Sequence, residues 1–472
     1  MIQKKKHKQG LFYCTLRAYE LFLNDCFFYK KVYRIGKENI PPDGTPVLFV
    51  SNHQNCLCDP LSVIFTVTDR KINMFVRADI FAVHPWLTKF FNILAMNPAY
   101  RLDMDGKDLL SKNMDMFKKT EVKILDGESA LMYPEGRHQG KNWLGDFTFG
   151  YTKLAFETAA LGGFQTDIWI QPCCNHYSSY RDIQQEVIVE FGKPVSLKSY
   201  YELYKEKPRT AQRQVNELVR QRVCDMMLHI PDLKNYKAID FLRNTTCGRQ
   251  FAERQGFKAD YLPDKLHADQ LFVKKLQDAM QNDGAAQTDT LPADGAASGV
   301  AQNTATIQIV YEDALTVESR LKKLKIRDDQ FDKRPGWGSI ILSAAALVVL
   351  FPAWVFSLWP NIFIYKIPDL LMRRIKDKMF HNSFLFVSSS LLTMPLFYTL
   401  TFILVWIFIN VWVALIYALA LPWLGLFAYR YGRLAVKTMQ NIRFRRVAKT
   451  DEGRKLRDLR NHLVERLNQL LE

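Results

Sequence analysis

The chain of 472 residues is long enough for two or three structural units, and its formal net charge of +16 favours anionic partners. Anionic lipid and nucleic acid both fit that charge, but the basic clusters flank apolar segments and no nucleic-acid-binding motif is present. The composition therefore argues against nucleic acid as a partner and favours membrane lipid. Its eight cysteines offer no Cys-x-x-Cys spacing, which argues against a zinc site and predicts reduced thiols in a cytosolic domain.

Residues 1–39 predict an N-terminal segment at a membrane surface. Residues 1–10 are strongly basic, but Arg17, Glu20 and Asp25 follow them, so this region makes a poor secretory signal. Residues 11–33 are rich in phenylalanine, tyrosine and leucine with scattered charges, which is typical of an amphipathic interfacial helix. The alternative is a helix packed on the core of the domain that follows.

The first candidate site lies where an apolar run ends. Residues 47–50 predict a strand covered on both faces, and His53 follows it. Asp59 comes six residues later, beside a proline that favours the start of a helix. Residues six apart in one helix lie about 240° apart, so the two side chains can meet only if residues 54–58 form an irregular turn. The carboxylate would then fix the histidine tautomer, whereas the alternative is a surface histidine beside a helix-capping aspartate.

Four more strands are predicted after this site. Residues 72–76 predict a strand with Arg77 at its exit, and Arg101 comes after an apolar, helix-like segment. Residues 129–133 predict a buried strand that ends in a Pro-Glu-Gly turn. A short apolar strand is predicted to end at Pro172, and one more strand is expected at 186–191.

In this order, the motifs resemble those of the glycerolipid acyltransferase family, the enzymes that acylate glycerol 3-phosphate or lysophosphatidate. The family's first motif is a histidine, a four-residue spacer and an aspartate. Here the spacer has five residues, a variant similar to that of fungal-type glycerol-3-phosphate acyltransferases and their bacterial relatives. The resemblance covers residues 40–200 and implies an α/β domain with a mixed sheet flanked by helices.

The resemblance also implies roles for single residues. His53 would be the general base, and Asp59 would orient it. An arginine at the position of Arg101 binds the substrate phosphate in the family, a task suited to the two-pronged guanidinium. Arg77 stands where relatives often carry lysine, and Pro172 would help to shape the acyl-donor pocket.

The third motif departs from the family's Phe-Pro-Glu-Gly-Thr-Arg sequence. Glu135 and Gly136 match and would belong to the glycerol phosphate site, with Glu135 binding a hydroxyl group or holding a cation. Arg137 occupies the threonine position and His138 the arginine position, so their roles transfer poorly. His138 is either a second titrating group or a polar turn residue. The resemblance implies no metal or organic cofactor, and acyl-CoA or acyl carrier protein would carry the acyl group.

The second half of the chain is different in character. Residues 201–281 alternate charged and apolar residues at helical spacing, which predicts a helical extension of unknown purpose. Residues 282–308 have almost no large apolar side chains and predict a disordered linker. A charged helix is expected within 309–337.

Residues 338–430 predict a membrane region. Residues 338–365 carry no charge and could cross a bilayer of about 30 Å, although Pro352 and Pro360 interrupt them. Residues 381–429 suit two crossings with a turn near Asn410. Basic clusters precede, separate and follow these stretches, and all three can be cytosolic only if the first stretch re-enters. We therefore expect a re-entrant segment plus a two-helix hairpin, with three full spans as the alternative.

Residues 431–472 predict a basic amphipathic helix. Its leucines recur at helical spacing and would pack on another helix of the chain or on a second copy in a homodimer: Leu456, Leu459, Leu463, Leu467 and Leu470.

Together the motifs predict an integral membrane enzyme with its catalytic domain on the cytosolic face. It would transfer a fatty acyl group to a hydroxyl of glycerol 3-phosphate, with lysophosphatidate and dihydroxyacetone phosphate as alternative acceptors. A different class of hypothesis is a non-catalytic membrane scaffold that keeps the domain for lipid binding.

Overall fold

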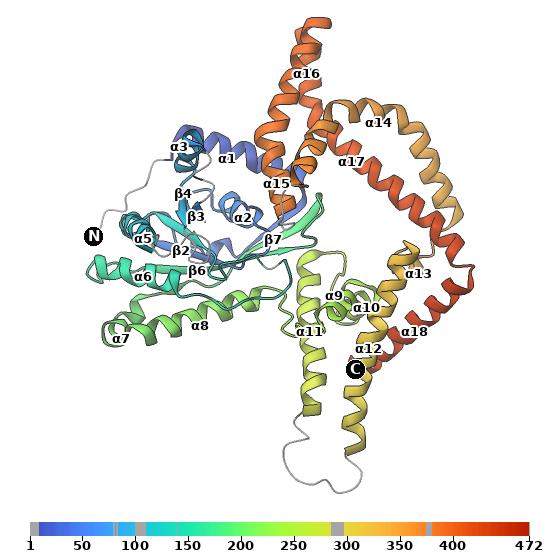
Figure 1. Ribbon diagram of the computed structural model, residues 1–472, viewed down its shortest axis with the longest axis horizontal. Helices are drawn as coiled ribbons and strands as arrows, with labels where there is room; N and C mark the ends of the chain where they lie inside the picture. The colour runs from blue at the N-terminus through green and yellow to red at the C-terminus, as the bar shows by residue number, and fades with distance from the viewer. Residues whose placement is uncertain are drawn as a thin grey trace. The chain divides into compact units, whose positions relative to one another are not determined.

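The computed structural model describes residues 9–78, 81, 84–99, 110–138, 140–284, 297–373 and 380–471. These residues form two compact units (Figure 1). Unit 1 consists of Met1–Leu228 and Ile367–Leu392, and unit 2 consists of His229–Lys366 and Thr393–Glu472.

In the described part of the chain, unit 1 is built on an eight-stranded mixed sheet with the order β1-β7-β6-β2-β5-β3-β4, in which β8 also pairs with β6. Strand β2 runs parallel to both of its neighbours, whereas β7 runs antiparallel to β6. The sheet therefore confirms the predicted mixed α/β fold. The strands are β1 (Tyr29–Ile35), β2 (Val47–Ser51), β3 (Ile72–Arg77), β4 (Met96–Ala99), β5 (Ser129–Met132), β6 (Trp169–Tyr177), β7 (Gln185–Phe191) and β8 (Val195–Ser196).

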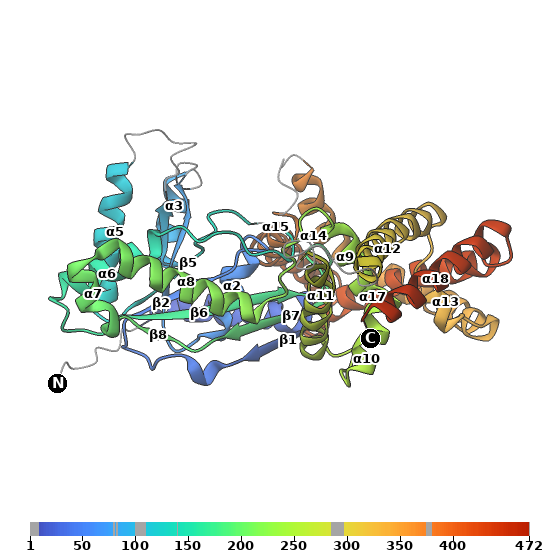
Figure 2. The same ribbon diagram turned by 90° about the horizontal axis from the view of Figure 1, so that it is seen from below.

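The centre of the sheet is fully buried, as its apolar sequence requires. All five residues of β2 are buried, because the strand lies between β5 and β6 and helices cover the sheet. Helices α6 (Gly150–Leu161) and α8 (Pro208–Met226) pack into the same hydrophobic core as β2 and run along the sheet (Figure 2). The remaining helices of unit 1 are α1 (Leu11–Leu23), α2 (Cys58–Thr66), α3 (Pro85–Ile93), α5 (Leu110–Leu125), α7 (Tyr201–Glu206) and α15 (His381–Ser388).

The predicted boundary at residue 200 differs from the structure. Helix α8 lies within the region predicted as a separate helical extension, yet it belongs to unit 1. Its buried residues recur every four positions and complete the core beside the sheet: Ala211, Val215, Val219 and Val223. Only the part beyond Leu228 belongs to unit 2.

The N-terminal prediction also needs correction. Residues 29–35 form β1, an edge strand that pairs parallel with β7, rather than part of an interfacial helix. Val32, Tyr33 and Ile35 are β-branched or aromatic, which are residue types that favour strands. Helix α1 buries Tyr13 and Leu23 but exposes Leu11 and Phe12, so one of its faces packs on unit 1 while the other remains accessible.

Glu20 of α1 makes the stability of unit 1 depend on pH. The residue is buried, and this burial raises the pKa of its carboxyl group from 4.5 to about 7. The neutral carboxyl is therefore favoured on folding, and the stability present below about pH 4.5 is lost as the pH rises through about 7. We expect the melting temperature of the detergent-solubilised protein to fall between pH 5 and pH 8, and Glu20→Gln to reduce that fall. An equal fall in both proteins would contradict this assignment.

The regular secondary structure of unit 2 is helical in its described residues. The terminal helix α18 packs along α12, and its buried leucines, among them Leu456, Leu463 and Leu467, face the inside of the unit. Its Arg460 is buried and pairs with Asp328 and Asp332 at 2.6 and 2.7 Å. The tail helix thus packs within the chain, which is one of the two arrangements expected from its leucines. The helices are α9 (Tyr236–Asn244), α10 (Thr246–Arg254), α11 (Leu262–Gly284), α12 (Ala297–Leu324), α13 (Gln330–Lys333), α14 (Trp337–Met372, ending in unit 1), α16 (Met394–Phe408), α17 (Val411–Val447) and α18 (Asp451–Leu471).

Two predicted boundaries in this half differ from the structure. Helix α11 continues to Gly284 and α12 begins at Ala297, so helices occupy both ends of the predicted linker at 282–308. Alanine and glutamine have high helix propensity, which favours helix at both ends of this region. The side chains of Ile307 and Val310 in α12 are buried and stabilise this helix by packing. Helix α17 runs through residues 431–447, so the predicted C-terminal helix is the end of α17 followed by the separate α18.

Among the residues that the structure describes, three helical stretches are long and apolar enough to cross a membrane: Trp337–Met372, His381–Phe408 and Val411–Val447. They are consistent with a membrane protein. The predicted turn near Asn410 is confirmed, because α16 ends at Phe408 and the Asn410 side chain accepts the Val413 N–H at the start of α17. Helix α14 continues through Pro352, Pro360 and Pro368 and is bent along its length (Figure 1). Its re-entry into the membrane stays a prediction.

Candidate active site

The loop after β2 brings His53 and Asp59 together. Nδ1 of His53 lies 2.8 Å from Oδ2 of Asp59. Strand β2 ends at Ser51, irregular turns follow, and α2 begins at Cys58, which places Asp59 in its first turn. The expected irregular turn is therefore confirmed, although the helix begins two residues before Pro60, the residue predicted to start it.

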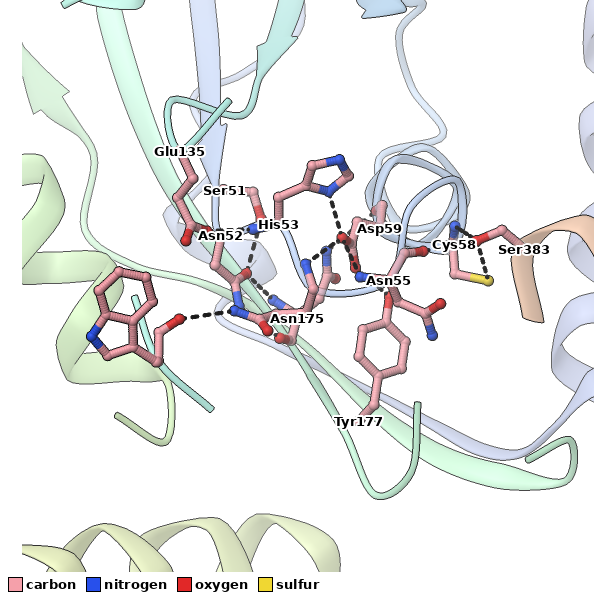
Figure 3. Close-up of polar contacts among 12 residues, drawn as sticks. Ser51, Asn52, His53, Asn55, Cys58, Asp59, Glu135, Asn175, Tyr177 and Ser383 are labelled. Carbon is pink, nitrogen blue, oxygen red and sulfur yellow. Dashed lines mark hydrogen bonds and ion pairs between the residues drawn. The ribbon is translucent and has the colours of Figure 1, made fainter. Parts of the chain in front are cut away.

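The Asp59 carboxylate is fully buried and saturated with donors (Figure 3). Its Oδ2 accepts the backbone N–H groups of Gln54 and Asn55 at 2.7 and 2.8 Å, and its Oδ1 accepts the Tyr177 hydroxyl at 2.7 Å. Burial raises the pKa of Tyr177 well above its usual value, so this hydroxyl keeps its proton and donates.

This environment fixes the histidine tautomer. A carboxylate can only accept, so Nδ1 of His53 carries the proton of the 2.8 Å bond to Asp59. In the neutral imidazole Nε2 is then an acceptor, and this second nitrogen points away from the carboxylate (Figure 3). The His53 side chain is 20% exposed, so it can meet a reactant. The pair has the geometry of a general base with its orienting acid.

Glu135 holds the backbone beneath the histidine. One carboxylate oxygen accepts the His53 backbone N–H at 2.7 Å, and the other accepts the N–H of Gly145 at 2.9 Å. Burial raises the pKa of Glu135 above its usual range. The carboxylate thus joins the turn after β5 to the loop after β2, a positioning role that the sequence did not predict. Its predicted role in binding glycerol phosphate stays a prediction.

Helix α8 supports this connection from the other side. Arg220 donates to the carbonyl oxygens of Gly145 and Leu144 at 3.2 and 3.3 Å, and Asn216 donates to Phe147 at 3.1 Å. The segment that presents the Gly145 N–H to Glu135 is therefore held by side chains of α8. Helix α8, for which the sequence suggested no purpose, thus supports the His53 loop through Gly145 and Glu135.

Removing the Arg220 side chain should therefore impair catalysis. In Arg220→Ala the 144–147 segment loses two hydrogen bonds, and small displacements of a catalytic group are costly, so we expect kcat to fall about tenfold. Arg222 is a matched control, because it lies on the same helix and donates to two carbonyl oxygens at Lys193 and Pro194. Steady-state assays measure kcat for both variants, and Arg222→Ala should keep the wild-type kcat. An equal loss of kcat in Arg222→Ala would contradict the specific role of Arg220.

The turn after β5 adds two rings to the site. Tyr133 stacks on the His53 imidazole with 4.4 Å between ring centroids, and the His138 ring lies edge-on at 5.6 Å. The His138 ring therefore lies beside the His53 imidazole, and its role in the reaction stays a prediction. Gly136 adopts a φ of 65°, a left-handed conformation that glycine accepts readily, and Arg137 is exposed.

The remaining predicted residues have different outcomes. Arg77 is the last residue of β3, which lies beyond β5 from β2 and points in the same direction, so it reaches the same edge of the sheet as His53. Arg101 lies outside the described residues, and its phosphate-binding role stays a prediction.

Pro172 does not end its strand, so that prediction is wrong. It pairs with Val50 inside β6, which continues to Tyr177 because residues 173–177 pair with β7. Its role in the acyl-donor pocket stays a prediction.

Sequence reasoning missed Tyr177, whose hydroxyl binds Asp59, and a pair of asparagines beside it. Asn52 accepts the backbone N–H of Asn175 at 2.9 Å and donates to its carbonyl oxygen at 3.0 Å. The continuation of β6 beyond its proline was the signal that could have revealed them. Within the described residues, no group of three or more His, Cys, Asp and Glu side chains could hold a metal ion.

The sequence is similar to those of known acyltransferases. Residues 31–176 match the model of the acyltransferase family. The chain is 29% identical over 126 residues to the chloroplastic 1-acyl-sn-glycerol-3-phosphate acyltransferase LPAT1 of Arabidopsis thaliana, a match that covers 26% of this chain and 32% of that protein. It is likewise 29% identical over 126 residues to the corresponding enzyme BAT2 of Brassica napus, covering 26% and 33%. The chain thus spans about a third of the length of these curated relatives.

A solved structure is also similar. The crystal structure of the 1-acyl-sn-glycerophosphate acyltransferase PlsC from Thermotoga maritima is 16% identical, with a TM-score of 0.30, and the match covers 44% of this chain and 79% of that one. The acyltransferase match includes strand β2 and the His53–Asp59 pair that follows it. Over this region the chain is similar to 1-acyl-sn-glycerol-3-phosphate acyltransferases, which supports a glycerolipid acyltransferase assignment.

Proposed function

We propose that this protein is a membrane-bound O-acyltransferase that transfers a fatty acyl group from an acyl thioester to a hydroxyl of glycerol 3-phosphate. The observation that carries the proposal is the hydrogen bond of 2.8 Å between His53 and the buried Asp59, which leaves Nε2 of His53 to take a proton. The acyltransferase family match to residues 31–176 supports the reaction class.

The proposed reaction follows from these groups. Nε2 of His53 removes the hydroxyl proton as the glycerol oxygen attacks the thioester carbonyl carbon, and general-base help of this kind is worth about 10² to 10⁴ in rate. The new C–O bond forms, the C–S bond breaks, and the imidazolium returns its proton to the leaving thiolate. The Asp59 carboxylate stabilises the imidazolium in the meantime. The products are an ester and a free thiol.

The phosphate end of the acceptor requires cations. Arg101, with Arg77 and Arg137 as further candidates, would grip the phosphate and present the hydroxyl to His53. Glu135 and Gly136 would line the same site, and Pro172 the acyl-donor pocket. The donor would be acyl-CoA or an acyl carrier protein, with no further cofactor.

Lysophosphatidate is the second candidate acceptor, because both curated relatives are named as 1-acyl-sn-glycerol-3-phosphate acyltransferases. Glycerol 3-phosphate remains the first candidate acceptor, because the five-residue spacer between His53 and Asp59 resembles that of fungal-type glycerol-3-phosphate acyltransferases. The catalytic unit would face the cytosol, where both substrates are found, with membrane lipid around the three apolar helices. A homodimer through the C-terminal helix would have to use a face of α18 other than its buried leucines.

A thiol-release assay tests the proposal. The purified full chain in lipid nanodiscs is given palmitoyl-CoA with glycerol 3-phosphate, lysophosphatidate, dihydroxyacetone phosphate or no acceptor. We expect thiol release that depends on a glycerol phosphate, together with formation of the matching ester. Release with lysophosphatidate alone would move the assignment to the second acceptor. No acceptor-dependent release, with palmitoyl-CoA or with palmitoyl acyl carrier protein, would favour the scaffold hypothesis instead.

A further inference from the structure

Unit 1 contains a segment that lies far from its other residues in the sequence. Residues 380–392 belong to this unit, and Ser383 in the first turn of α15 lies against the turn between His53 and Asp59 (Figure 3). Its hydroxyl accepts the Cys58 N–H at 3.1 Å and lies 2.9 Å from the Asn55 carbonyl oxygen, to which it donates. The two partners are 325 and 328 residues away in the sequence, and the serine is fully buried.

The Ser383 hydroxyl bonds to the turn on both sides of a residue with an uncommon backbone conformation. Cys56 adopts a φ of 43°, a left-handed conformation that is uncommon for residues other than glycine. Asn55 and Cys58 flank this position, and the Ser383 hydroxyl bonds to both of them. Because the Asn55 N–H is in turn bonded to Oδ2 of Asp59, the serine is linked through one residue to the His53–Asp59 pair.

Other contacts hold α15 in this place. Asn382 donates to the Asp182 carbonyl oxygen at 3.2 Å, and the Phe386 ring lies 4.8 Å from that of Phe28. Tyr19 donates to the Ser390 carbonyl oxygen at 2.9 Å. These contacts fix the position of α15, and α15 in turn holds the Ser383 hydroxyl against the turn.

We propose that Ser383 is a positioning residue for the His53–Asp59 pair, so that an aligned active site requires α15 to be docked. This inference rests on the proposed function. Helix α15 is also the start of His381–Phe408, one of the three stretches long and apolar enough to cross a membrane. The membrane region would therefore supply part of the support of the catalytic turn, and the reaction would depend on it beyond simple anchoring.

The test compares three variants of the full chain in nanodiscs. Ser383→Ala removes the hydroxyl, but the Cys58 N–H keeps a bond of 2.9 Å to the Asn55 carbonyl oxygen, so the protein should fold. Ser383→Thr restores a hydroxyl group. Ser388→Ala is the matched control, because that serine lies on the same helix and bonds only to its own helix, at the Phe384 carbonyl oxygen, in the contacts described.

We expect Ser383→Ala to lower kcat about ten- to a hundredfold while KM for both substrates stays within about twofold, because the base is misaligned rather than the binding groups. Ser383→Thr should regain at least part of the loss, and Ser388→Ala should match the wild type. Amide hydrogen exchange of the peptide covering residues 54–59 should accelerate in Ser383→Ala and not in Ser388→Ala.

The outcomes separate this inference from the proposed function. A wild-type chain that releases no thiol with any acceptor contradicts the proposed function, and the exchange of residues 54–59 then decides whether Ser383 holds the turn. Unchanged exchange in Ser383→Ala, an unchanged kcat in an active enzyme, or the same losses in Ser388→Ala would each overturn the positioning role.

Discussion

Replacing His53 with alanine is expected to lower kcat for acyl transfer by about 10² to 10⁴, the usual contribution of a positioned general base. The imidazole is the group whose Nε2 can take the hydroxyl proton, since Nδ1 is committed to Asp59 at 2.8 Å. KM for the acyl donor should change little, because the ring is not a binding group in this mechanism. Continuous thiol-release kinetics with purified wild type and variant measure the effect.

The fold should survive this substitution. Glu135 bonds to the backbone N–H of residue 53, which alanine keeps, so the link between the two loops remains. His138→Ala is the matched control, because its ring lies 5.6 Å from that of His53 in the same site. A His53→Ala enzyme with more than a tenth of wild-type kcat would remove the histidine from the mechanism. A larger loss in His138→Ala than in His53→Ala would transfer the role of base to His138.

Local sequence patterns predicted the centre of the fold because the central strands are apolar on both faces. Four consecutive apolar residues from Val47 to Val50 could be satisfied only by a strand between others, and all are fully buried. The geometric argument for an irregular turn between His53 and Asp59 held for a related reason, since helix geometry leaves no other way for the two to meet.

The supports of the site could not be predicted in this way, because their partners are distant in the sequence. Tyr177, Arg220 and Ser383 reach the site from β6, α8 and α15. Each looks locally like an ordinary strand or helix residue, and its role arises only from tertiary packing. The edge strand β1 was missed for the same reason, because its pairing partner β7 begins more than 150 positions later.

The proline of β6 shows how a sound local rule misleads. Proline lacks an N–H group and is usually confined to strand edges or ends. On one side of β6 the neighbour changes at this point, from β8 at residues 169–170 to β7 from Cys173 onward, so the proline lies in the gap between the two pairings. The strand therefore continues to Tyr177, and the hydroxyl that completes the Asp59 site lies beyond the predicted end.

The second large effect is expected for Asp59→Asn, which separates the charge of the carboxylate from its shape. The amide oxygen can take the place of Oδ2 and accept from His53, Gln54 and Asn55. The amide NH₂ can donate to Tyr177, whose hydroxyl is able to accept once it rotates. The turn should thus persist, while the imidazolium formed during proton transfer loses its counter-charge. We expect kcat to fall about 10²- to 10³-fold with the melting temperature nearly unchanged.

Asp59→Ala provides the contrast, because it also leaves the buried N–H groups of Gln54 and Asn55 without their acceptor. Each such group costs about 1–3 kcal/mol, so this variant should lose both activity and several degrees of melting temperature. Thermal unfolding and kcat are measured on the same preparations. Asp59→Asn should show a lower kcat alone, whereas Asp59→Ala should show a lower kcat and a lower melting temperature. An Asp59→Asn enzyme that keeps more than a third of wild-type kcat would reduce Asp59 to a structural cap of the turn. Proton transfer at His53 would then proceed without help from a neighbouring negative charge.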